Sequence, residues 1–311
     1  DVNGVSDDDL SKIILDDEID ILFDLTGHSA KNRLLLFARK PAPIQVSWAG
    51  YVGTTGLSSM DYFLSDIHST PKDEDKYYSE KVIRMPDGWL CYAPPEYAPG
   101  IGPLPLKQNG RVTFCSFSNP GKINEEVISV WAAIMNAVSN SCLLIKYSGI
   151  DTATNIERLT AKFAAKGINK SRLVLEGQSS HTNLLARYND VDIALDTFPY
   201  SGGLTTYEAL WMGVPVITVP GDTFASRHSK SHLTTVGLPE LIAENKDDYI
   251  RLAVELSGNA ERMAELRTGL RSWMANSPIC DGDRFTNNFT ATMRKIWRDW
   301  CLTQDFKDPK Q

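Results

Sequence analysis

Apolar runs of strand length recur through the later two thirds of this chain without regular alternation between apolar and polar residues. They cover residues 112–117, 141–147, 172–175, 191–195 and 214–219. Strands that are buried on both faces have this composition, because helices cover each side of a parallel sheet. After the first run, apolar residues from Ile123 to Val138 recur at steps of three and four and form one helical stripe. The pattern predicts a doubly wound α/β domain.

A second strand-and-helix pattern precedes this one. Strands are expected at residues 20–25, 44–48 and 60–64, and a helix is expected over residues 29–39. Between the two patterns, residues 92–105 are rich in Pro and Gly and follow neither a helical nor a strand period. This composition predicts an interdomain linker with a boundary near residue 100.

A last helical pattern runs from Arg284 to Trp300 and carries a stripe of aromatic and aliphatic residues. We expect this helix to pack back on the body of the protein. The predicted division is therefore an N-terminal domain over residues 1–100, a C-terminal domain over residues 101–281, and the final helix with a loose tail over residues 282–311.

Composition excludes several classes of protein. A chain of 311 residues with 42% hydrophobic and 23% charged residues falls among ordinary globular proteins and is long enough for two cores. Its net charge of −7 argues against a nucleic-acid partner, and no apolar run approaches the length of a membrane span. The five cysteines include no CxxC pair, which predicts reduced thiols and a cytoplasmic protein.

The stretch "LDTFPYSGGLTTYEALWMGVPVIT" places polar residues where a buried strand gives way to a helix. Ligands of parallel sheets bind beyond the carboxyl ends of the strands, near helix N-termini. Glycines there would let a phosphate approach the backbone, and hydroxyls would donate to it; the residues concerned are Gly202, Gly203, Thr205 and Thr206. Glu208 could accept the hydroxyls of a ribose. Alternatively, Glu208 stabilises the helix N-terminus and the glycines make a turn, and the spacing leaves both interpretations open.

The loop after the first strand of the same predicted sheet reads "FSNPGKINEE" and places Lys122 at the entry to the striped helix. A lysine at this point could meet a diphosphate as a point charge, although a single lysine is more often a surface residue. Two helix starts suited to anions in one sheet favour the first interpretation. The chain has no GxxxxGK[ST] motif and no GxGxxG after a strand, so it is neither a P-loop protein nor a dinucleotide-binding protein.

Three long motifs together carry a family resemblance. They are "RKPAPIQVSWAGYVGTTGLSSMDYFLSD", "YSEKVIRMP" and "DIALDTFPYSGGLTTYEALWMGVPVITVPGDTFASR". In this order they resemble the catalytic region of the O-GlcNAc transferase and SPINDLY family of glycosyltransferases, from about residue 19 to residue 300. The resemblance implies an α/β fold of the GT-B type, with two Rossmann-like domains facing across a cleft and the N-terminal one incomplete in this chain. It also implies that the final helix crosses back to the N-terminal domain.

The same resemblance implies roles for individual residues. Lys122 corresponds to the lysine that neutralises the donor diphosphate, and Glu208 to the acidic residue that holds the ribose. The other implied donor contacts are Asn119 beside the diphosphate, Thr205 with Thr206 at a phosphate, Ala49 and Gly50 near the donor sugar, and His181 and Arg187 near the base.

The chemistry that the family implies is transfer of a sugar from a nucleotide donor to Ser or Thr hydroxyls of proteins, with inversion. We expect no metal and no cofactor, because Lys122 and a helix dipole can stabilise the leaving diphosphate and no DxD-like pair ends a strand. The donor sugar is expected to be GlcNAc from UDP-GlcNAc. Gly203 and Leu204 stand where many O-GlcNAc members have His-Thr, so GDP-fucose, as in the SPINDLY branch, is the alternative.

The general base is less well indicated. The family's histidine lies in an element upstream of this sequence, as do the tetratricopeptide repeats that present protein acceptors. Among the five histidines, His28 lies at a strand end and is a candidate, whereas His68, His228 and His232 have no evident partner in the sequence. A rival hypothesis is that the chain is a truncated, non-catalytic remnant that binds a nucleotide sugar without transferring it.

Overall fold

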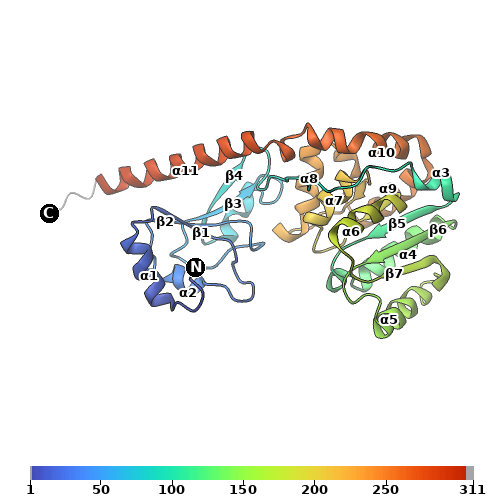
Figure 1. Ribbon diagram of the computed structural model, residues 1–311, viewed down its shortest axis with the longest axis horizontal. Helices are drawn as coiled ribbons and strands as arrows, with labels where there is room; N and C mark the ends of the chain where they lie inside the picture. Colours follow the sequence, from blue (N-terminus) through green and yellow to red (C-terminus); the bar gives the residue numbers. More distant parts are fainter. Residues whose placement is uncertain (1, 306–311) are drawn as a thin grey trace. The chain divides into compact units, whose positions relative to one another are not determined.

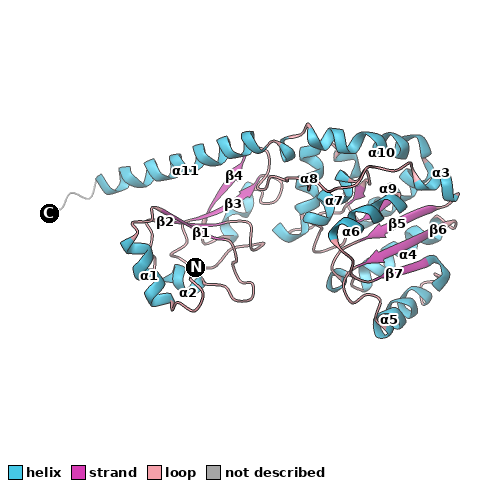
Figure 2. Cartoon of the chain, viewed as in Figure 1, coloured by secondary structure: helices cyan, strands magenta, loops and turns pink. Residues whose placement is uncertain are grey.

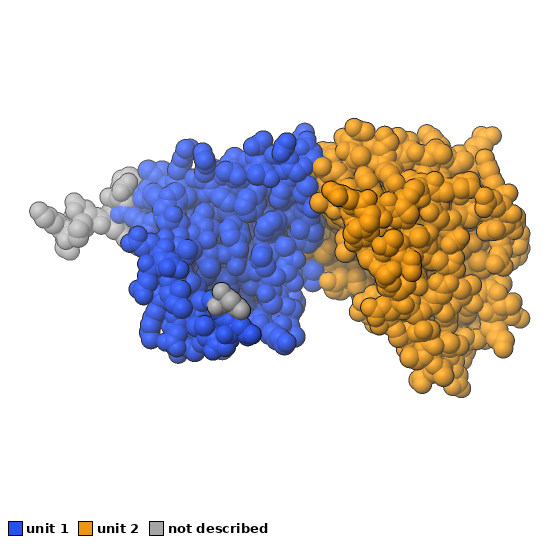
Figure 3. All heavy atoms as spheres, in the orientation of Figure 1, with its two compact units in different colours: residues 1–91, 281–311 blue, residues 92–280 orange. Residues whose placement is uncertain are grey.

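The computed structural model describes residues 2–305, and these form two compact units. One unit consists of residues 1–91 together with residues 281–311, and the other of residues 92–280 (Figure 3). Each unit is built around one parallel sheet with helices on its flanks (Figure 2). No helix in the described part of the chain is long and apolar enough to cross a membrane.

The first unit has a four-stranded sheet in the order β1-β2-β3-β4 (Figure 1). Its strands are β1 (Ile21–Asp24), β2 (Ile44–Ser47), β3 (Tyr62–Asp66) and β4 (Lys81–Met85). Its helices are α1 (Asp7–Asp16), α2 (Leu34–Ala38) and α11 (Gly282–Asp305), with a 3-10 turn η1 (Lys72–Tyr77). All neighbouring strands run parallel, so each must be joined to the next by a crossover.

The two faces of this sheet are covered by different helices, because successive side chains of a strand point to opposite faces. On β1, Ile21 and Phe23 belong to the cluster that α11 covers, whereas Leu22 joins the cluster of α1 and α2. The stripe of α11 that packs on the sheet is Phe285, Phe289, Met293, Ile296, Trp297 and Trp300. The aromatic pattern near the end of the sequence therefore serves to cover the sheet of residues 21–85.

The helix expected over residues 29–39 forms only over α2. Lys31 lies in the left-handed region at φ 63°. The side chain of Asn32 makes hydrogen bonds both to a residue before it and to a residue after it. Its amide nitrogen donates to the backbone oxygen of Ser29 at 2.9 Å, and its oxygen accepts from the backbone nitrogen of Leu34 at 3.1 Å. These local bonds replace helical ones, which is how Asn commonly competes with a helix.

The second unit has a five-stranded sheet in the order β7-β6-β5-β8-β9. Its strands are β5 (Val112–Ser116), β6 (Ser141–Lys146), β7 (Leu173–Glu176), β8 (Ile193–Leu195) and β9 (Val216–Ile217). All of its pairs are parallel, and the chain order reverses between β5 and β8. Ligands of open parallel sheets bind at such a reversal, beyond the carboxyl ends of the two strands.

Helices flank this second sheet (Figure 1). They are α3 (Pro105–Asn109), α4 (Glu125–Ala137), α5 (Ala153–Ala164), α6 (His181–Arg187), α7 (Leu204–Trp211), α8 (His228–Val236), α9 (Lys246–Gly258) and α10 (Ala260–Ala275). The stripe predicted on α4 is buried, and Trp131 at its centre is fully enclosed. Asn124 caps this helix, because its side chain accepts from the backbone nitrogen of Val127 at 2.9 Å.

The segment predicted as a linker lies on the second unit. The Tyr92 backbone nitrogen donates to the Ile279 oxygen at 2.8 Å, and the Tyr92 ring stacks on Tyr207 with centroids 5.1 Å apart. Further along, the Gly102 nitrogen donates to the Asn189 side chain at 2.8 Å. The division between the units therefore falls between residues 91 and 92, rather than near residue 100. Composition showed correctly that residues 92–105 form no long regular element, but the backbone groups of that segment bond to unit 2.

Candidate functional site

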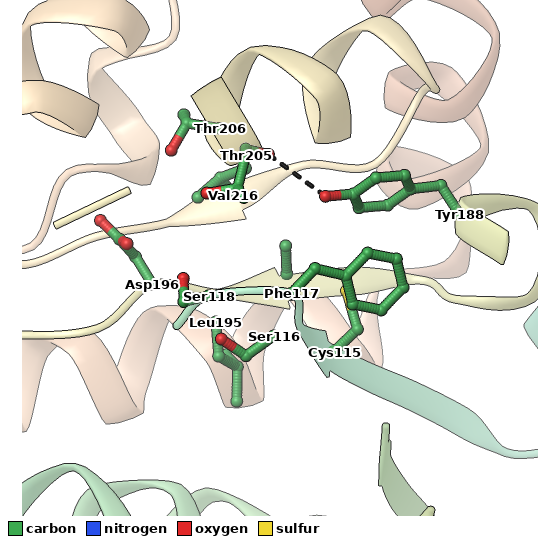
Figure 4. A pocket seen from close by; sticks show the side chains of 11 residues that line it. Cys115, Ser116, Phe117, Ser118, Tyr188, Leu195, Asp196, Thr205, Thr206 and Val216 are labelled. Carbon is green, nitrogen blue, oxygen red and sulfur yellow. Dashed lines mark hydrogen bonds between the residues drawn. The ribbon is translucent and has the colours of Figure 1, made fainter. Parts of the chain in front are cut away.

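A small pocket opens at the point of reversal in the second sheet (Figure 4). It is lined by the ends of β5 and β8, by the start of α7 and by one tyrosine; the residues are 115–118, 194–196, Thr205, Thr206, Tyr188 and Val216. In Figure 4 the Tyr188 hydroxyl points to the start of α7, where it donates to the backbone oxygen of Thr205 at 3.3 Å. The pocket thus lies where parallel sheets bind ligands.

Asp196, at the end of β8, holds the loop between this strand and α7. Its Oδ1 accepts from the backbone nitrogens of Thr197 at 2.9 Å and Gly202 at 2.7 Å, and its Oδ2 accepts from the Thr218 hydroxyl at 2.7 Å. Burial raises the pKa of Asp196, and the hydrogen bonds it accepts oppose that shift. The sequence places an acidic residue here but does not indicate its role, because only the folded loop shows which backbone nitrogens it faces.

Gly202 is required by close packing. A Cβ at this position would lie 2.5 Å from the Thr206 hydroxyl and 3.2 Å from the Asp196 carboxylate, so no larger residue fits without rearrangement. Gly203, the N-cap of α7, is less restricted, since the nearest atom to a Cβ there is 3.8 Å away. Both glycines were predicted to let a phosphate approach the backbone. In the structure, close packing by itself requires glycine at position 202.

The hydroxyls of the predicted threonine pair are placed differently. Thr206 is buried and its hydroxyl lies 2.8 Å from that of Ser229, at the start of α8. Thr205 is half-buried and lines the pocket at the first turn of α7. Thr205 is therefore the accessible hydroxyl, and Thr206 joins α7 to α8.

Lys122 reaches across from β5 to the loop before α7. It ends the 3-10 turn η2 (Pro120–Lys122), which Asn119 caps by accepting from the Gly121 nitrogen at 2.9 Å. The Lys122 ammonium donates to the Ser201 backbone oxygen at 2.8 Å and lies 3.9 Å from the centroid of the Tyr200 ring. Burial lowers the pKa of Lys122, and the charge of Asp196 opposes this. The two loops singled out in the sequence thus meet at one point.

Glu208 lies in α7 with only 4% of its side chain exposed. Its Oε1 is 2.8 Å from Nε2 of His181, the first residue of α6, and the Tyr97 hydroxyl lies 2.8 Å from Nδ1 of the same ring. Burial raises the pKa of Glu208, while the bond to His181 lowers it. An ionised Glu208 requires a proton on Nε2, so in neutral His181 Nδ1 accepts from Tyr97. The carboxylate is therefore oriented by a partner that the spacing alone did not indicate.

Arg187 ends α6 and its guanidinium is held by carboxylates of the protein. Its Nη2 lies 2.7 Å from Oε1 of Glu176, which ends β7, and its Nη1 lies 2.8 Å from Asp190. The hydrogen bonds that Arg187 donates to Glu176 are the main cause of the raised pKa of Arg187. Any contact with a base would have to compete with these two ion pairs.

The other three predicted residues follow strands of the first unit. Ala49 lies in the left-handed region at φ 64°, and a Cβ on Gly50 would come within 1.8 Å of the Leu25 backbone oxygen. The end of β2 is thus packed tightly against the loop after β1. His28, in that loop, has its Nε2 2.9 Å from the Thr55 backbone oxygen and its ring edge toward Tyr51. These three residues therefore lie at the carboxyl end of the first sheet.

Within residues 2–305 no three His, Cys, Asp or Glu side chains gather in a way that could hold a metal ion. Two buried groups near Lys122 were not predicted as site residues: Asp196, and His228, which begins α8. The signal available for His228 was only its position in "FASRHSKSH", which indicates neither its burial nor its neighbours.

The family model for glycosyl transferase family 41 matches residues 3–92 and 105–289. The chain is 40% identical to the probable UDP-N-acetylglucosamine–peptide N-acetylglucosaminyltransferase SPINDLY of Petunia hybrida, over 97% of this chain and 32% of that protein. It is 30% identical to the protein SEC of Arabidopsis thaliana, which has the same enzyme name, over 98% of this chain and 32% of that one. The chain thus spans about a third of the length of these relatives.

Among solved structures, a mutant of the Thermobaculum terrenum O-GlcNAc transferase matches with a TM-score of 0.92 and 37% identity, covering 98% of this chain and 58% of that one. The Anabaena protein HepE, solved with UDP, matches with a TM-score of 0.59 and 10% identity, which shows a shared fold alone. The family match extends over both sheets and the likeness in structure over almost the whole chain. The chain therefore belongs to glycosyl transferase family 41, a family of glycosyltransferases, and has the GT-B fold.

Proposed function

We propose that this chain is the catalytic region of an inverting glycosyltransferase that moves GlcNAc from UDP-GlcNAc to Ser or Thr hydroxyls of proteins. The relatives of Petunia and Arabidopsis are named as probable transferases of N-acetylglucosamine from UDP-N-acetylglucosamine to peptides. The observation that carries the proposal is the meeting of Lys122 with the loop before α7, at the reversal of a parallel sheet. An ammonium group, a helix N-terminus and a buried carboxylate on that helix match the diphosphate and the ribose of a nucleotide sugar.

The leaving group of such a transfer is a nucleoside diphosphate, on which negative charge grows as the bond to the sugar breaks. Lys122 and the N-terminus of α7 can stabilise this charge, because they are fixed by the fold before the donor arrives. Asn119 caps the turn that carries Lys122 and so fixes where the ammonium lies. We propose that these groups, together with Thr205, stabilise the leaving diphosphate during transfer, and that no resident metal takes part.

For the acceptor hydroxyl, His28 remains our candidate base. Its Nε2 lies against the Thr55 backbone oxygen and must therefore donate, which leaves the lone pair of the neutral ring on Nδ1. Ala49 and Gly50 follow the end of the neighbouring strand β2, and we propose that this edge of the sheet contacts the donor sugar.

A specific observation supports a second donor. Leu204 is exposed at the start of α7, and Gly203 and Leu204 precede the threonine pair where many O-GlcNAc members have His-Thr, which favours the SPINDLY branch. The alternative is therefore a protein O-fucosyltransferase that uses GDP-fucose.

Thermal unfolding with UDP, GDP, UDP-GlcNAc and GDP-fucose tests these proposals. A ligand that binds only the native state at about 100 times its dissociation constant adds about 2.7 kcal/mol of stability and raises the midpoint. We expect the uridine pair to raise it more than the guanosine pair. The reverse order would favour fucose, and a shift without sugar transfer to a peptide would favour the non-catalytic remnant. No shift with any of the four would contradict a nucleotide-sugar site.

We expect Glu208→Gln to remove discrimination against a 2′-deoxyribose. The substitution keeps the size of the side chain and removes the charge that strengthens hydrogen bonds from hydroxyls, a loss of roughly 1 to 3 kcal/mol at a buried site. Calorimetry of the wild type should show weaker binding of 2′-deoxy-UDP than of UDP, and this difference should shrink in the variant. Glu255→Gln, on the exposed face of α9, is the matched control. Equal binding of the two ligands by the wild type would show that Glu208 only stabilises α7.

A further inference from the structure

His228 begins α8 and has 5% of its surface exposed. Its backbone nitrogen donates to the Ser201 hydroxyl at 3.0 Å, and the hydroxyl of the next residue, Ser229, donates to the Gly202 backbone oxygen at 3.1 Å. The first turn of α8 is thus fastened to the loop that Lys122 also contacts. Two cation-forming side chains from distant parts of the sequence therefore border the same four residues of backbone, 200–203.

The imidazole itself faces this loop. The His228 ring is nearly parallel to the Tyr200 ring, at 19° with centroids 6.0 Å apart, and Lys122 lies over the same ring at 3.9 Å. Nδ1 of His228 is 3.8 Å from the place that a Cβ on Gly203 would take, at the N-cap of α7. His228 and Lys122 are therefore both within the immediate surroundings of the helix start where the proposed diphosphate binds.

The surroundings of His228 keep it neutral in the free protein. The groups that face it or adjoin it are Lys122 from η2, Tyr200 from the loop, Phe224 from the turn Phe224–Ser226, His232 and Arg227 from its own helix and cap, and, stacked on His232, Tyr207 of α7. Burial, and next the positive charge of Lys122, lower the pKa of His228 to about 4. Both causes disfavour the protonated form of the ring. The ring nevertheless remains beside the loop of residues 200–203.

We propose that His228 is a proton-linked binding residue for the donor diphosphate. As the diphosphate binds beside Lys122, one imidazole nitrogen of His228 forms an N–H bond with a proton taken from the solvent, and the imidazolium shares the phosphate charge with the ammonium. An anion between the two side chains replaces their repulsion by two attractions, since nearby opposite charge favours the charged form. The inference rests on the proposed function and adds a second cation, and a pH dependence, to that site.

Calorimetry of the whole chain in two buffers with different ionisation enthalpies tests the proposal. The probes are UDP-GlcNAc and GDP-fucose without acceptor, because each phosphate of a nucleotide sugar is substituted at two oxygens, by one ester and the shared anhydride, and carries no proton that titrates near neutrality. At pH about 6 the binding enthalpy should depend on the buffer, with uptake approaching one proton, and affinity should rise up to about tenfold for each unit of falling pH. If the wild type binds with the same enthalpy in both buffers, no proton is taken up. That result would overturn the proposal without any variant.

Variants assign the proton to this ring. Because the bonded pair His181 and Glu208 also adjoins the proposed ribose site, the assignment requires that the uptake be lost in His228→Gln and in His228→Asn, and kept in His68→Gln, the same change in the first unit. Uptake that persists in a folded His228 variant would overturn the proposal. Failure of both nucleotide sugars to bind the wild type would instead contradict the proposed function, and the inference with it. Binding without uptake leaves the proposed function standing and removes only the role of His228.

Discussion

Replacing Lys122 by Ala is expected to lower the rate of sugar transfer by roughly two to three orders of magnitude, as loss of a fixed donor to a developing anion does in other enzymes. The ammonium is half-buried, donates to the Ser201 oxygen and faces the start of α7. The ammonium should contribute to binding only through its attraction to the phosphate charge. Calorimetry should therefore show a loss of affinity for the nucleoside diphosphate of roughly 1.5 to 3 kcal/mol, and little change for the nucleoside.

Two further variants separate charge from structure. Lys122→Gln keeps a long side chain with an N–H donor, one atom shorter than lysine, and removes the charge, so it should lose diphosphate affinity with a smaller change to the packing of the loop than Lys122→Ala. Lys107→Ala, exposed on α3, removes a lysine charge elsewhere in the same unit and should change neither quantity. An equal loss of affinity for nucleoside and nucleoside diphosphate in Lys122→Ala would contradict the role assigned to the charge.

The meeting of Lys122 with the loop before α7 was accessible from sequence because it depends on a regularity of parallel sheets. Each of the two loops follows a buried strand, and the carboxyl ends of parallel strands lie at one edge. The strands themselves were predicted to within about two residues of their observed bounds, as the β5 and β6 ranges show. Continuous apolar composition suffices for this, since it reflects burial on both faces.

What could not be predicted depends on contacts between distant residues. Glu208 meets His181 across 27 positions and His181 meets Tyr97 across 84, and no local spacing encodes such pairs. Arg187 was assigned to the base through the family resemblance, but the carboxylate of Glu176 holds it at the end of β7. The strand β4 was missed because its run, "KVIRM", is short, contains two charged residues and is buried only at Met85.

The segment of residues 92–105 shows a different limit. Pro and Gly exclude a long regular element, and this was read as exposure between domains. A segment without regular structure still has backbone oxygens and nitrogens, and buried ones must find partners. Here the partners are side chains, since Arg267 donates to the Gly102 oxygen at 3.1 Å and Arg271 to the Pro99 oxygen at 2.8 Å. The composition of such a segment predicts that its backbone is irregular. It does not show which side chains bond to that backbone.

Arg267→Ala is accordingly expected to destabilise the protein by about 3 to 5 kcal/mol, the cost of breaking a buried and fully bonded charge. Arg267 lies in α10 with 2% of its surface exposed. Besides the Gly102 oxygen, its guanidinium donates to the backbone oxygens of Tyr188 at 3.1 Å and Val191 at 3.3 Å, and to the Asn189 side chain at 3.0 Å. Truncation removes this donor from all four acceptors and opens a cavity, although the Asn189 side chain keeps its bond from the Gly102 nitrogen.

Urea and thermal unfolding measure this loss, with an expected fall in the midpoint of roughly 10 °C for a unit of this size. Arg262→Ala, one turn earlier on the same helix, is the control: its ion pairs with Glu240 and Glu265 are on the surface and should contribute at most about 1 kcal/mol. Arg267 holds the backbone oxygen of Tyr188, and the Tyr188 hydroxyl donates to the Thr205 oxygen at the start of α7. The Arg267 variant should therefore also lose nucleotide affinity, and the loss should grow with the disorder of the segment that leads into β8. A free energy of unfolding within about 1 kcal/mol of the wild type would show that the acceptors find water instead, and that the segment of residues 92–105 is not held by α10.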